Sequence, residues 1–133
     1  LGLWFPDEDF ACQSPLPDFT STDTIYFMEA LAVCSAIHAI QNMPEVPPRM
    51  LVYTDNTNVV AMFNTLRAEP QYNSILISAM DVLMEHDVDL RVEHVSGRTN
   101  IIADALSRFQ NECVLRSAPN VQIFDFKPPR NAL

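Results

Sequence analysis

Three acidic residues occupy positions that are unusual for surface carboxylates. Glu29 is the only formally charged residue in the helical, apolar stretch of residues 25–43. Asp55 closely follows the apolar run of residues 50–53, and Asp104 falls early in a helical pattern that comes after a strand and a turn. Carboxylates from three separate segments could converge on a divalent metal ion, and oxygen ligands suit Mg²⁺. The sequence therefore suggests Glu29, Asp55 and Asp104 as metal ligands.

Each acid also has a simpler interpretation. Glu29 could lie at the rim of its helix and reach water, which would avoid the cost of burying an unpaired carboxylate. Asp55 could cap the helix that we expect to begin near Thr57. Asp104 could pair with Arg108 four residues later, in a solvated contact. What favours the metal hypothesis is the coincidence of three acids, each placed where an α/β sheet builds its site.

Two histidines have different expected roles. His94 stands shortly before the turn that precedes Asp104. Its ring could move protons to and from a leaving oxygen, or it could form a hydrogen bond within the turn, and both interpretations stay open. His38 lies among apolar residues and is expected to be a packed helix residue.

The composition indicates one globular domain. The chain has 133 residues, of which 48% are hydrophobic, and no apolar run approaches the ~20 residues that cross a bilayer. Its three cysteines are far apart and lack the spacing of a zinc site or a disulfide framework, so we expect an intracellular location, in the cytoplasm or the nucleus. The chain starts at Leu1 without an initiator Met, so we expect a piece of a longer polypeptide.

The charge is strongly acidic. Seventeen Asp and Glu residues against eight Lys and Arg residues give a formal net charge of −9. Proteins that bind nucleic acid unaided usually present a basic surface, whereas the arginines here are scattered. We therefore expect the isolated chain to bind polyanions weakly.

The pattern of residues predicts alternating strands and helices. Unbroken apolar character at residues 49–54 predicts an inner, parallel strand that is buried on both faces. Pro-containing residues 110–133 show little helical periodicity and are expected to form a linker or tail after a domain at residues 1–109. In order, the expected elements are strands at 1–5 and 10–13, a helix from Thr22 or Asp23 to about Asn42, a strand at 49–54, a helix from Asn56 or Thr57 to about Leu66, a helix at 73–85, a strand at 88–93, and a helix carrying Asp104.

Four sequence blocks together resemble a known family. They are Phe-Met-Glu-Ala-Leu-Ala around Glu29, Tyr-Thr-Asp-Asn around Asp55, the His-Val-Ser-Gly-Arg-Thr-Asn turn that begins at His94, and Ala-Asp-Ala-Leu-Ser-Arg around Asp104. Over residues 1–109 the chain resembles the ribonuclease H domain that follows the reverse transcriptase in retrotransposon polyproteins. The resemblance implies an α/β, RNase H-like mixed sheet flanked by helices.

The resemblance also implies an activity. In that family the RNA strand of an RNA/DNA hybrid is hydrolysed with two Mg²⁺ ions, for which Mn²⁺ is an alternative. Glu29, Asp55 and Asp104 would then be the metal ligands, and His94 would assist proton transfer or product release. The implied partners are the hybrid, an upstream reverse transcriptase domain, and, from the Phe-Lys-Pro-Pro-Arg segment of the tail, a possible downstream recombinase or integrase domain.

One departure from the family changes the expectation. The family's first strand, which is central in the sheet and carries the first catalytic Asp, is missing ahead of Leu1. We therefore expect impaired nuclease activity, and an inactive RNase H-like scaffold or tether is the alternative. An integrase-like strand transferase is disfavoured because Glu29 precedes Asp55. A non-nuclease binding module lacks support because the chain has only Gly2 and Gly97 and hence no Gly-rich phosphate loop.

One segment of the tail has strand character. Residues 120–126 could fill the place of the missing strand beside residues 50–54 and bring Asp125 near Asp55. The bracketing prolines instead favour an extended connector on the surface, in which case the sheet is expected to be split.

Overall fold

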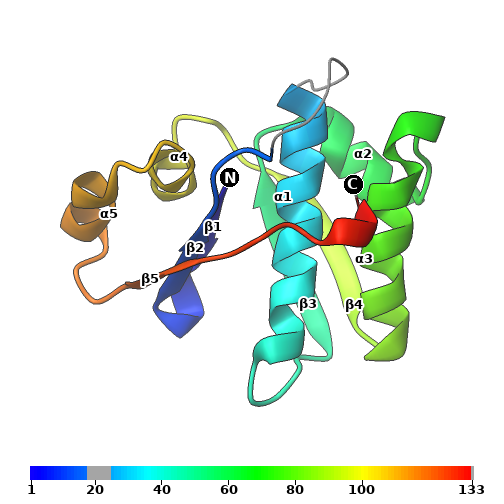
Figure 1. The fold of residues 1–133 in the computed structure, drawn as a ribbon, viewed down its shortest axis with the longest axis horizontal. Coiled ribbons are helices and arrows are strands. Elements are labelled where there is room, and N and C mark those ends of the chain that lie inside the picture. Colours follow the sequence, from blue (N-terminus) through cyan, green and yellow to red (C-terminus); the bar gives the residue numbers. More distant parts are fainter. Residues whose placement is uncertain (18–24, 133) are drawn as a thin grey trace.

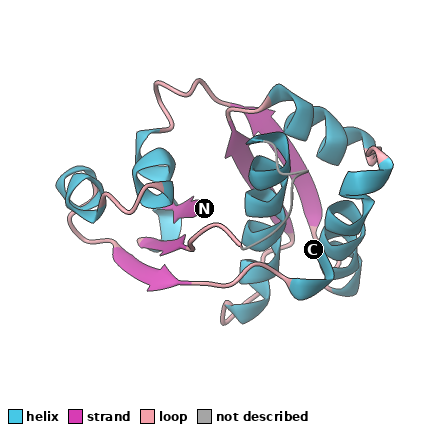
Figure 2. Cartoon of the chain, turned by 45° about the horizontal axis from the view of Figure 1, so that its top comes forward, coloured by secondary structure: helices cyan, strands magenta, loops and turns pink. Residues whose placement is uncertain are grey.

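The structure is a computed structural model that describes residues 1–17 and 25–132 as a mixed α/β chain (Figures 1 and 2). Up to α4, it has the expected order of strands and helices. The expected helix start at Thr22 or Asp23 lies outside the described residues. The elements are β1 (Gly2–Phe5), η1 (Pro6–Glu8), β2 (Phe10–Gln13), α1 (Ile25–Ala39), η2 (Ile40–Asn42), β3 (Arg49–Thr54), α2 (Thr57–Thr65), η3 (Pro70–Tyr72), α3 (Asn73–Glu85), β4 (Asp89–His94), α4 (Ile101–Ser107), α5 (Asn111–Ser117), β5 (Gln122–Asp125) and η4 (Arg130–Ala132), where η denotes a 3-10 helix.

The strands form two separate small sheets flanked by helices. One has the order β1-β2-β5, with β1 antiparallel to β2 and β2 parallel to β5. The other contains β3 and β4, which are parallel, and its register places Thr54 opposite His94. In Figure 1, α1 passes in front of β3, and β1 and β2 lie to the left of α1. The expected split of the sheet is confirmed.

The preference for a surface connector at residues 120–126 is wrong for the part that forms β5. This strand pairs with β2, and hydrogen bonds from Gln122 N–H to the Asp9 carbonyl (3.0 Å) and from Phe126 N–H to the Gln13 carbonyl (3.0 Å) extend the pairing at both ends. The bracketing prolines lie outside the strand, so they remove none of its donors. β5 does not lie beside β3 either. It pairs with β2, on the edge that is not paired with β1.

Burial of β3 on both faces is also wrong. Its burial alternates, and Leu51 and Tyr53 are 49% and 57% exposed. Met50 and Val52, on the other face, pack against the core. An inner parallel strand is apolar on both faces because helices cover both, whereas the described elements cover only one face of β3.

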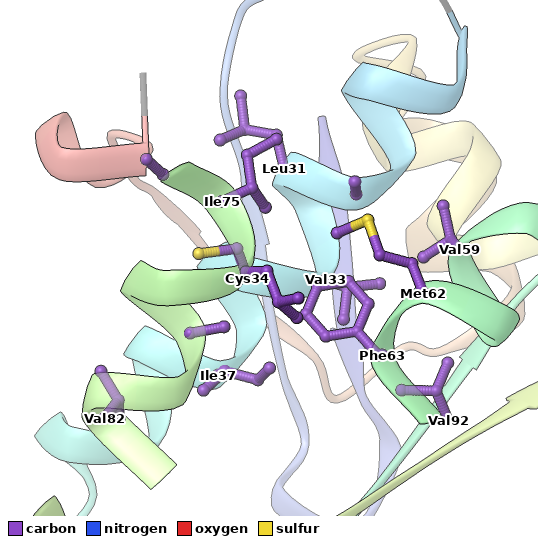
Figure 3. Close-up of a cluster of buried hydrophobic side chains, with 14 of the residues drawn as sticks. Leu31, Val33, Cys34, Ile37, Val59, Met62, Phe63, Ile75, Val82 and Val92 are labelled. Carbon is purple, nitrogen blue, oxygen red and sulfur yellow. The ribbon is translucent and has the colours of Figure 1, made fainter. Parts of the chain in front are cut away.

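The main core lies between α1, α2, α3 and the β3–β4 sheet. Figure 3 shows labelled side chains of α1, α2 and α3 in this core, with Val92 of β4 beside Phe63 of α2. No helix in the described ranges has both the length and the apolar character needed to cross a membrane. The cysteines Cys12 and Cys34 are buried, Cys113 is exposed, and all three are free. Labelled members of the core are Leu31, Val33, Cys34, Ile37, Val59, Met62, Phe63, Ile75, Val82 and Val92.

A second, smaller core holds α4 and α5 on the three-stranded sheet. Ala11 of β2 packs there with Ala105 and Leu106 of α4, Val114 of α5 and Val121. A side-chain Cβ at position 2 would meet the Ala103 carbonyl oxygen and the Leu106 side chain, so Gly2 permits the close approach of α4 to β1. This packing fixes the position of Asp104.

The segment expected to be a linker or tail contains ordered elements. After α5 and β5, the chain crosses to α3, where η4 packs. The Ser74 hydroxyl donates to the Ala132 carbonyl (3.0 Å), and the Ser78 hydroxyl donates to Oδ1 of Asn131 (2.6 Å). His38 Nε2 lies 2.8 Å from the Ser78 hydroxyl, so the expectation of a packed helix histidine is confirmed. The segment therefore connects the three-stranded sheet to the main core (Figure 1).

Candidate active site

An open groove of about 2290 Å³ lies between the two sheets. We call it the central groove. β1 and β3 form its walls, and α1 contributes to its lining. Glu29, Asp55 and Asp104 all line it, although they belong to α1, the residue after β3, and α4. The structure therefore brings the three predicted acids to one groove.

Glu29 occupies a half-buried position where several groups act on its charge. Burial raises the pKa of its carboxyl group above the ordinary value of 4.5, and repulsion from Asp55 and, less strongly, from Asp104 raises it further. The Thr54 hydroxyl donates a hydrogen bond of 3.4 Å to Oε2 of Glu29, and this bond and the Leu1 amino group lower the same pKa. Glu29 is thus a partly buried carboxylate whose charge is repelled by the other two acids.

Asp55 is exposed and does not cap α2. The N-cap is Asn56, whose Oδ1 accepts hydrogen bonds from the N–H groups of Asn58 (3.0 Å) and Val59 (3.2 Å). A Cβ on Gly97 would lie 3.4 Å from Oδ2 of Asp55, so the turn before α4 lies against this carboxylate. The capping interpretation of Asp55 is wrong, and its carboxylate remains available to a ligand.

Asp104 forms the surface pair that was its simpler interpretation. Nε of Arg108 lies 3.4 Å from Oδ1 of Asp104, and both side chains are more than half exposed. Such exposed pairs contribute about 0–1 kcal/mol, so this one holds the carboxylate only weakly. Asp104 can therefore exchange Arg108 for another cation at little cost.

His94 lies at the end of β4 and is exposed. In the described part of the chain its ring has no hydrogen bond, so the structure does not form the turn contact that was one alternative. The backbone of the next residue, Val95, donates to the Thr54 carbonyl (2.9 Å), which keeps the His94 loop beside the end of β3. His94 therefore lies opposite Thr54 in the sheet, but it is not among the residues that line the central groove with the three acids.

The donor set fits Mg²⁺ in chemistry but not in spacing. Carboxylate oxygens are the ligands that this ion takes from proteins. Within residues 1–17 and 25–132, however, no three His, Cys, Asp or Glu side chains approach closely enough to hold a metal ion. The three acids share a groove, and Glu29 is repelled by the other two, but in this arrangement the described residues do not form a metal centre.

Sequence reasoning did not identify Thr54 as part of the site. Its side chain is 3% exposed, and its hydroxyl, besides donating to Glu29, accepts a hydrogen bond of 3.3 Å from the N–H of Asn56. A threonine directly before Asp55 at a strand end was a usable signal, but its partner Glu29 is distant in sequence. Thr54 connects α1, β3 and α2 at the base of the site.

Comparisons of the chain with protein-family models, with curated proteins and with solved structures each found no match.

Proposed function

We propose that the chain is a ribonuclease H-type endonuclease domain, with an RNase H-like fold that lacks the family's first, central strand. It would hydrolyse the RNA strand of RNA/DNA hybrids during retrotransposon reverse transcription. The observation that supports this most is that Glu29, Asp55 and Asp104, from three separate segments, all line the central groove. Carboxylates that repel each other and have little cationic compensation favour the binding of a metal ion.

The site residues have different roles in the proposed reaction. Mg²⁺, or Mn²⁺ in its place, would supply the activation of water and the stabilisation of the leaving oxygen. Glu29, Asp55 and Asp104 would hold the metal, and Thr54 would orient Glu29 through its hydroxyl. His94, free of other partners in the described residues, would transfer a proton or assist product release.

Activity of this chain is expected to be impaired. Residues 1–133 do not supply the family's first Asp, and their net charge of −9 opposes a polyanionic hybrid. In the proposal, an upstream reverse transcriptase domain helps to hold the hybrid, and a recombinase or integrase domain follows in the same intracellular polyprotein. The chain alone would bind the hybrid weakly.

Paramagnetic Mn²⁺ tests the metal assignment without relying on activity. Titrated into the ¹⁵N-labelled chain, it should broaden the amide signals of Glu29, Asp55 and Asp104 first. In Asp55→Asn this broadening should require a higher Mn²⁺ concentration, whereas in the control Asp81→Asn, on the exposed face of α3, it should be unchanged. Broadening that is uniform over the acidic surface would contradict the proposal.

A catalytically inactive scaffold or tether is the second candidate. It is favoured by the lack of a metal-sized cluster in the described residues and by the pairing of Asp104 with Arg108. The two candidates differ when the chain is extended upstream by a strand that carries an Asp. An extended chain that binds Mn²⁺ but does not cut a hybrid would favour the scaffold.

A further inference from the structure

The outer edge of the three-stranded sheet has no neighbouring strand in the described part of the chain. β5 stands at the end of the order β1-β2-β5, so only its edge toward β2 is paired. α4 packs on β1 and β2, and α5 packs on α4, so these helices do not lie along the outer edge of β5. Figure 2 shows β5 as the outermost strand of its sheet. Unpaired edges are templates for the addition of another strand.

The hydrogen-bond pattern identifies which backbone groups of β5 face outward. The N–H groups of Gln122 and Phe126 donate to carbonyls on the β2 side, both at 3.0 Å. Because the bonding side alternates along a strand, the N–H and C=O groups of Ile123 and Asp125 point to the outer edge. This edge therefore offers a short row of donors and acceptors.

The outer edge of the other sheet is protected, in contrast to that of β5. The side chain of Asn64 bonds both backbone groups of Val92 in β4, with Nδ2 donating to the carbonyl (2.8 Å) and Oδ1 accepting from the N–H (3.1 Å). A side chain thus occupies the place of a further strand there. Among the described residues, no side chain does the same for Ile123 or Asp125.

An aromatic row ends at the outer edge of β5. Phe5 and Phe10 stack with their ring centroids 4.3 Å apart, and Phe10 meets Phe124 edge-on at 6.4 Å. The three rings cross the sheet from β1 through β2 to β5. Phe124, the last of them, is 50% exposed. An aromatic ring opposite Phe124 on an added strand would continue the row and cover this side chain.

A second copy of β5 supplies such a ring when the two strands pair antiparallel with Phe124 opposite Phe124. Ile123 of each copy then faces Asp125 of the other, and the two residues exchange both of their backbone hydrogen bonds. Other registers are less favourable. Centring on Asp125 would place two carboxylates opposite each other. Centring on Ile123 would need the Val121 N–H, which already donates to the Ala118 carbonyl (3.2 Å).

The charges near β5 favour the same antiparallel pairing. The acidic turn of Asp7, Glu8 and Asp9 adjoins the start of β5, because the Asp9 carbonyl accepts from Gln122. Lys127 lies beyond the end of β5, and all four charged side chains are exposed. Antiparallel pairing brings the end of one β5 beside the start of the other. The backbone of Lys127 would then lie two strand spacings, about 10 Å, from Asp9 of the second copy, where their opposite charges attract.

We propose that two copies of this chain form a dimer by pairing the outer edges of β5 antiparallel across a two-fold axis. The two three-stranded sheets then become one continuous sheet, and the interface uses the same residues of both copies. Repulsion between two chains of net charge −9 and the shortness of β5 make the dimer weak. β5 lies on the far side of β2 from β1, so the strand that the proposed function adds beside β1 would leave this edge free. The proposal holds whether or not the domain is a nuclease.

Sedimentation equilibrium and amide hydrogen exchange test the proposal on the unaltered chain. A monomer–dimer equilibrium should appear, with a dissociation constant between about 10 µM and 1 mM, as for other small interfaces. With rising protein concentration, exchange at Ile123 and Asp125 should slow because their N–H groups become bonded. Gln122 and Phe124 face β2 already, so their exchange should stay constant.

Variants at Asp125 locate the interface. Asp125→Pro removes an outward N–H and keeps the bonds to β2, and proline is tolerated at such edge positions. It should raise the dissociation constant about tenfold or more, because each dimer loses two hydrogen bonds. The control Asp125→Asn removes the same charge and keeps the N–H, so the constant should change by less than about threefold. If Asp125→Pro does not fold, the concentration dependence of exchange at Ile123 and Asp125 decides.

A change at Lys127 tests the charge pairing. Lys127→Glu should raise the dissociation constant about threefold or more, because it places a carboxylate near the acidic turn of the second copy. Arg67→Glu makes the same change of net charge at an exposed position after α2, and it should change the constant by less than about twofold.

Several results would overturn the proposal. One is a chain that remains monomeric up to about 1 mM. Another is a dimer that Asp125→Pro and Asp125→Asn weaken equally. Concentration-dependent protection of Gly2 or Leu51 in place of Ile123 would identify a different edge as the interface. Species that grow beyond the dimer would indicate head-to-tail pairing, which a two-fold interface excludes.

Discussion

The hydroxyl of Thr54 donates a hydrogen bond to the carboxylate of Glu29, which joins the end of β3 to the N-terminal part of α1. The two residues belong to segments that the chain brings together only when folded. Since Thr54 also accepts from the backbone of Asn56, this one buried side chain couples the position of Glu29 to the start of α2.

Thr54→Val should raise the pKa of Glu29, because the Thr54 hydroxyl lowers it. The variant should also lose about 1 kcal/mol of unfolding free energy, because the part-buried N–H of Asn56 loses its acceptor. Carboxyl ¹³C titration by NMR and urea denaturation measure the two effects. Thr57→Val, at an exposed position, is the control, and an unchanged Glu29 titration in Thr54→Val would contradict the bond.

Glu29→Gln should make the fold more stable at neutral pH. The pKa of Glu29 is raised in the folded state, mainly by burial, so the folded state binds its proton more tightly than the unfolded state. The contribution of Glu29 to stability is therefore fully present below its ordinary pKa of 4.5 and is lost as the pH rises through the raised value. Urea denaturation across this range should show the gain of Glu29→Gln shrinking toward acid pH, with exposed Glu45→Gln showing no such trend.

In the proposed function, nuclease activity should depend on a further strand ahead of Leu1. The chain should cut an RNA/DNA hybrid poorly or not at all with Mg²⁺, and an upstream extension that adds a strand with an Asp should activate it. Asp55→Asn in the extended chain should lower cleavage by about a hundredfold or more. Because Asp55 is exposed, the unfolding free energy should change by less than about 0.5 kcal/mol. Robust cleavage by the unextended chain would show that the fourth carboxylate is dispensable.

Asn64→Ala should destabilise the β3–β4 sheet. The change removes both hydrogen bonds to Val92 and should cost about 1–3 kcal/mol of unfolding free energy. It also uncovers the outer edge of β4, so light scattering should report faster aggregation. Asn58→Ala, at an exposed position on α2, should show neither effect.

Acid pH should release η4 from α3. Burial lowers the pKa of His38 in the folded state, so its contribution to stability is present above the ordinary value of 6.5 and is lost as the pH falls through the lowered value. The loss comes from the cost of charging a partly buried ring, which exceeds the opposite effects of Asp81 and of the hydrogen bond with Ser78, the residue that also bonds Asn131. Hydrogen exchange of residues 130–132 should therefore speed up at acid pH, and Ser78→Ala should show fast exchange already at neutral pH. Exchange in the exposed-site control Ser107→Ala should match the parent chain.

Local residue patterns were enough to predict most of the individual helices and strands. Apolar periodicity and helix boundaries located α2 and α3 closely, because these signals depend on residues within one or two turns. The sequence also identified the three acids of the groove, because a charge in an apolar stretch or at a strand end is visible without a fold.

Tertiary structure alone decided how the strands pair and which faces they expose. β5 is short and could add to any free edge, so its pairing with β2 depended on where α5 and η4 place its ends. Exposure of Leu51 and Tyr53 likewise depended on which elements cover β3. The hydrogen bond from Thr54 to Glu29 and the repulsion among the acids arise between segments distant in sequence. Local patterns carry no information on such contacts. These contacts stabilise the protein only after folding has brought the distant segments together.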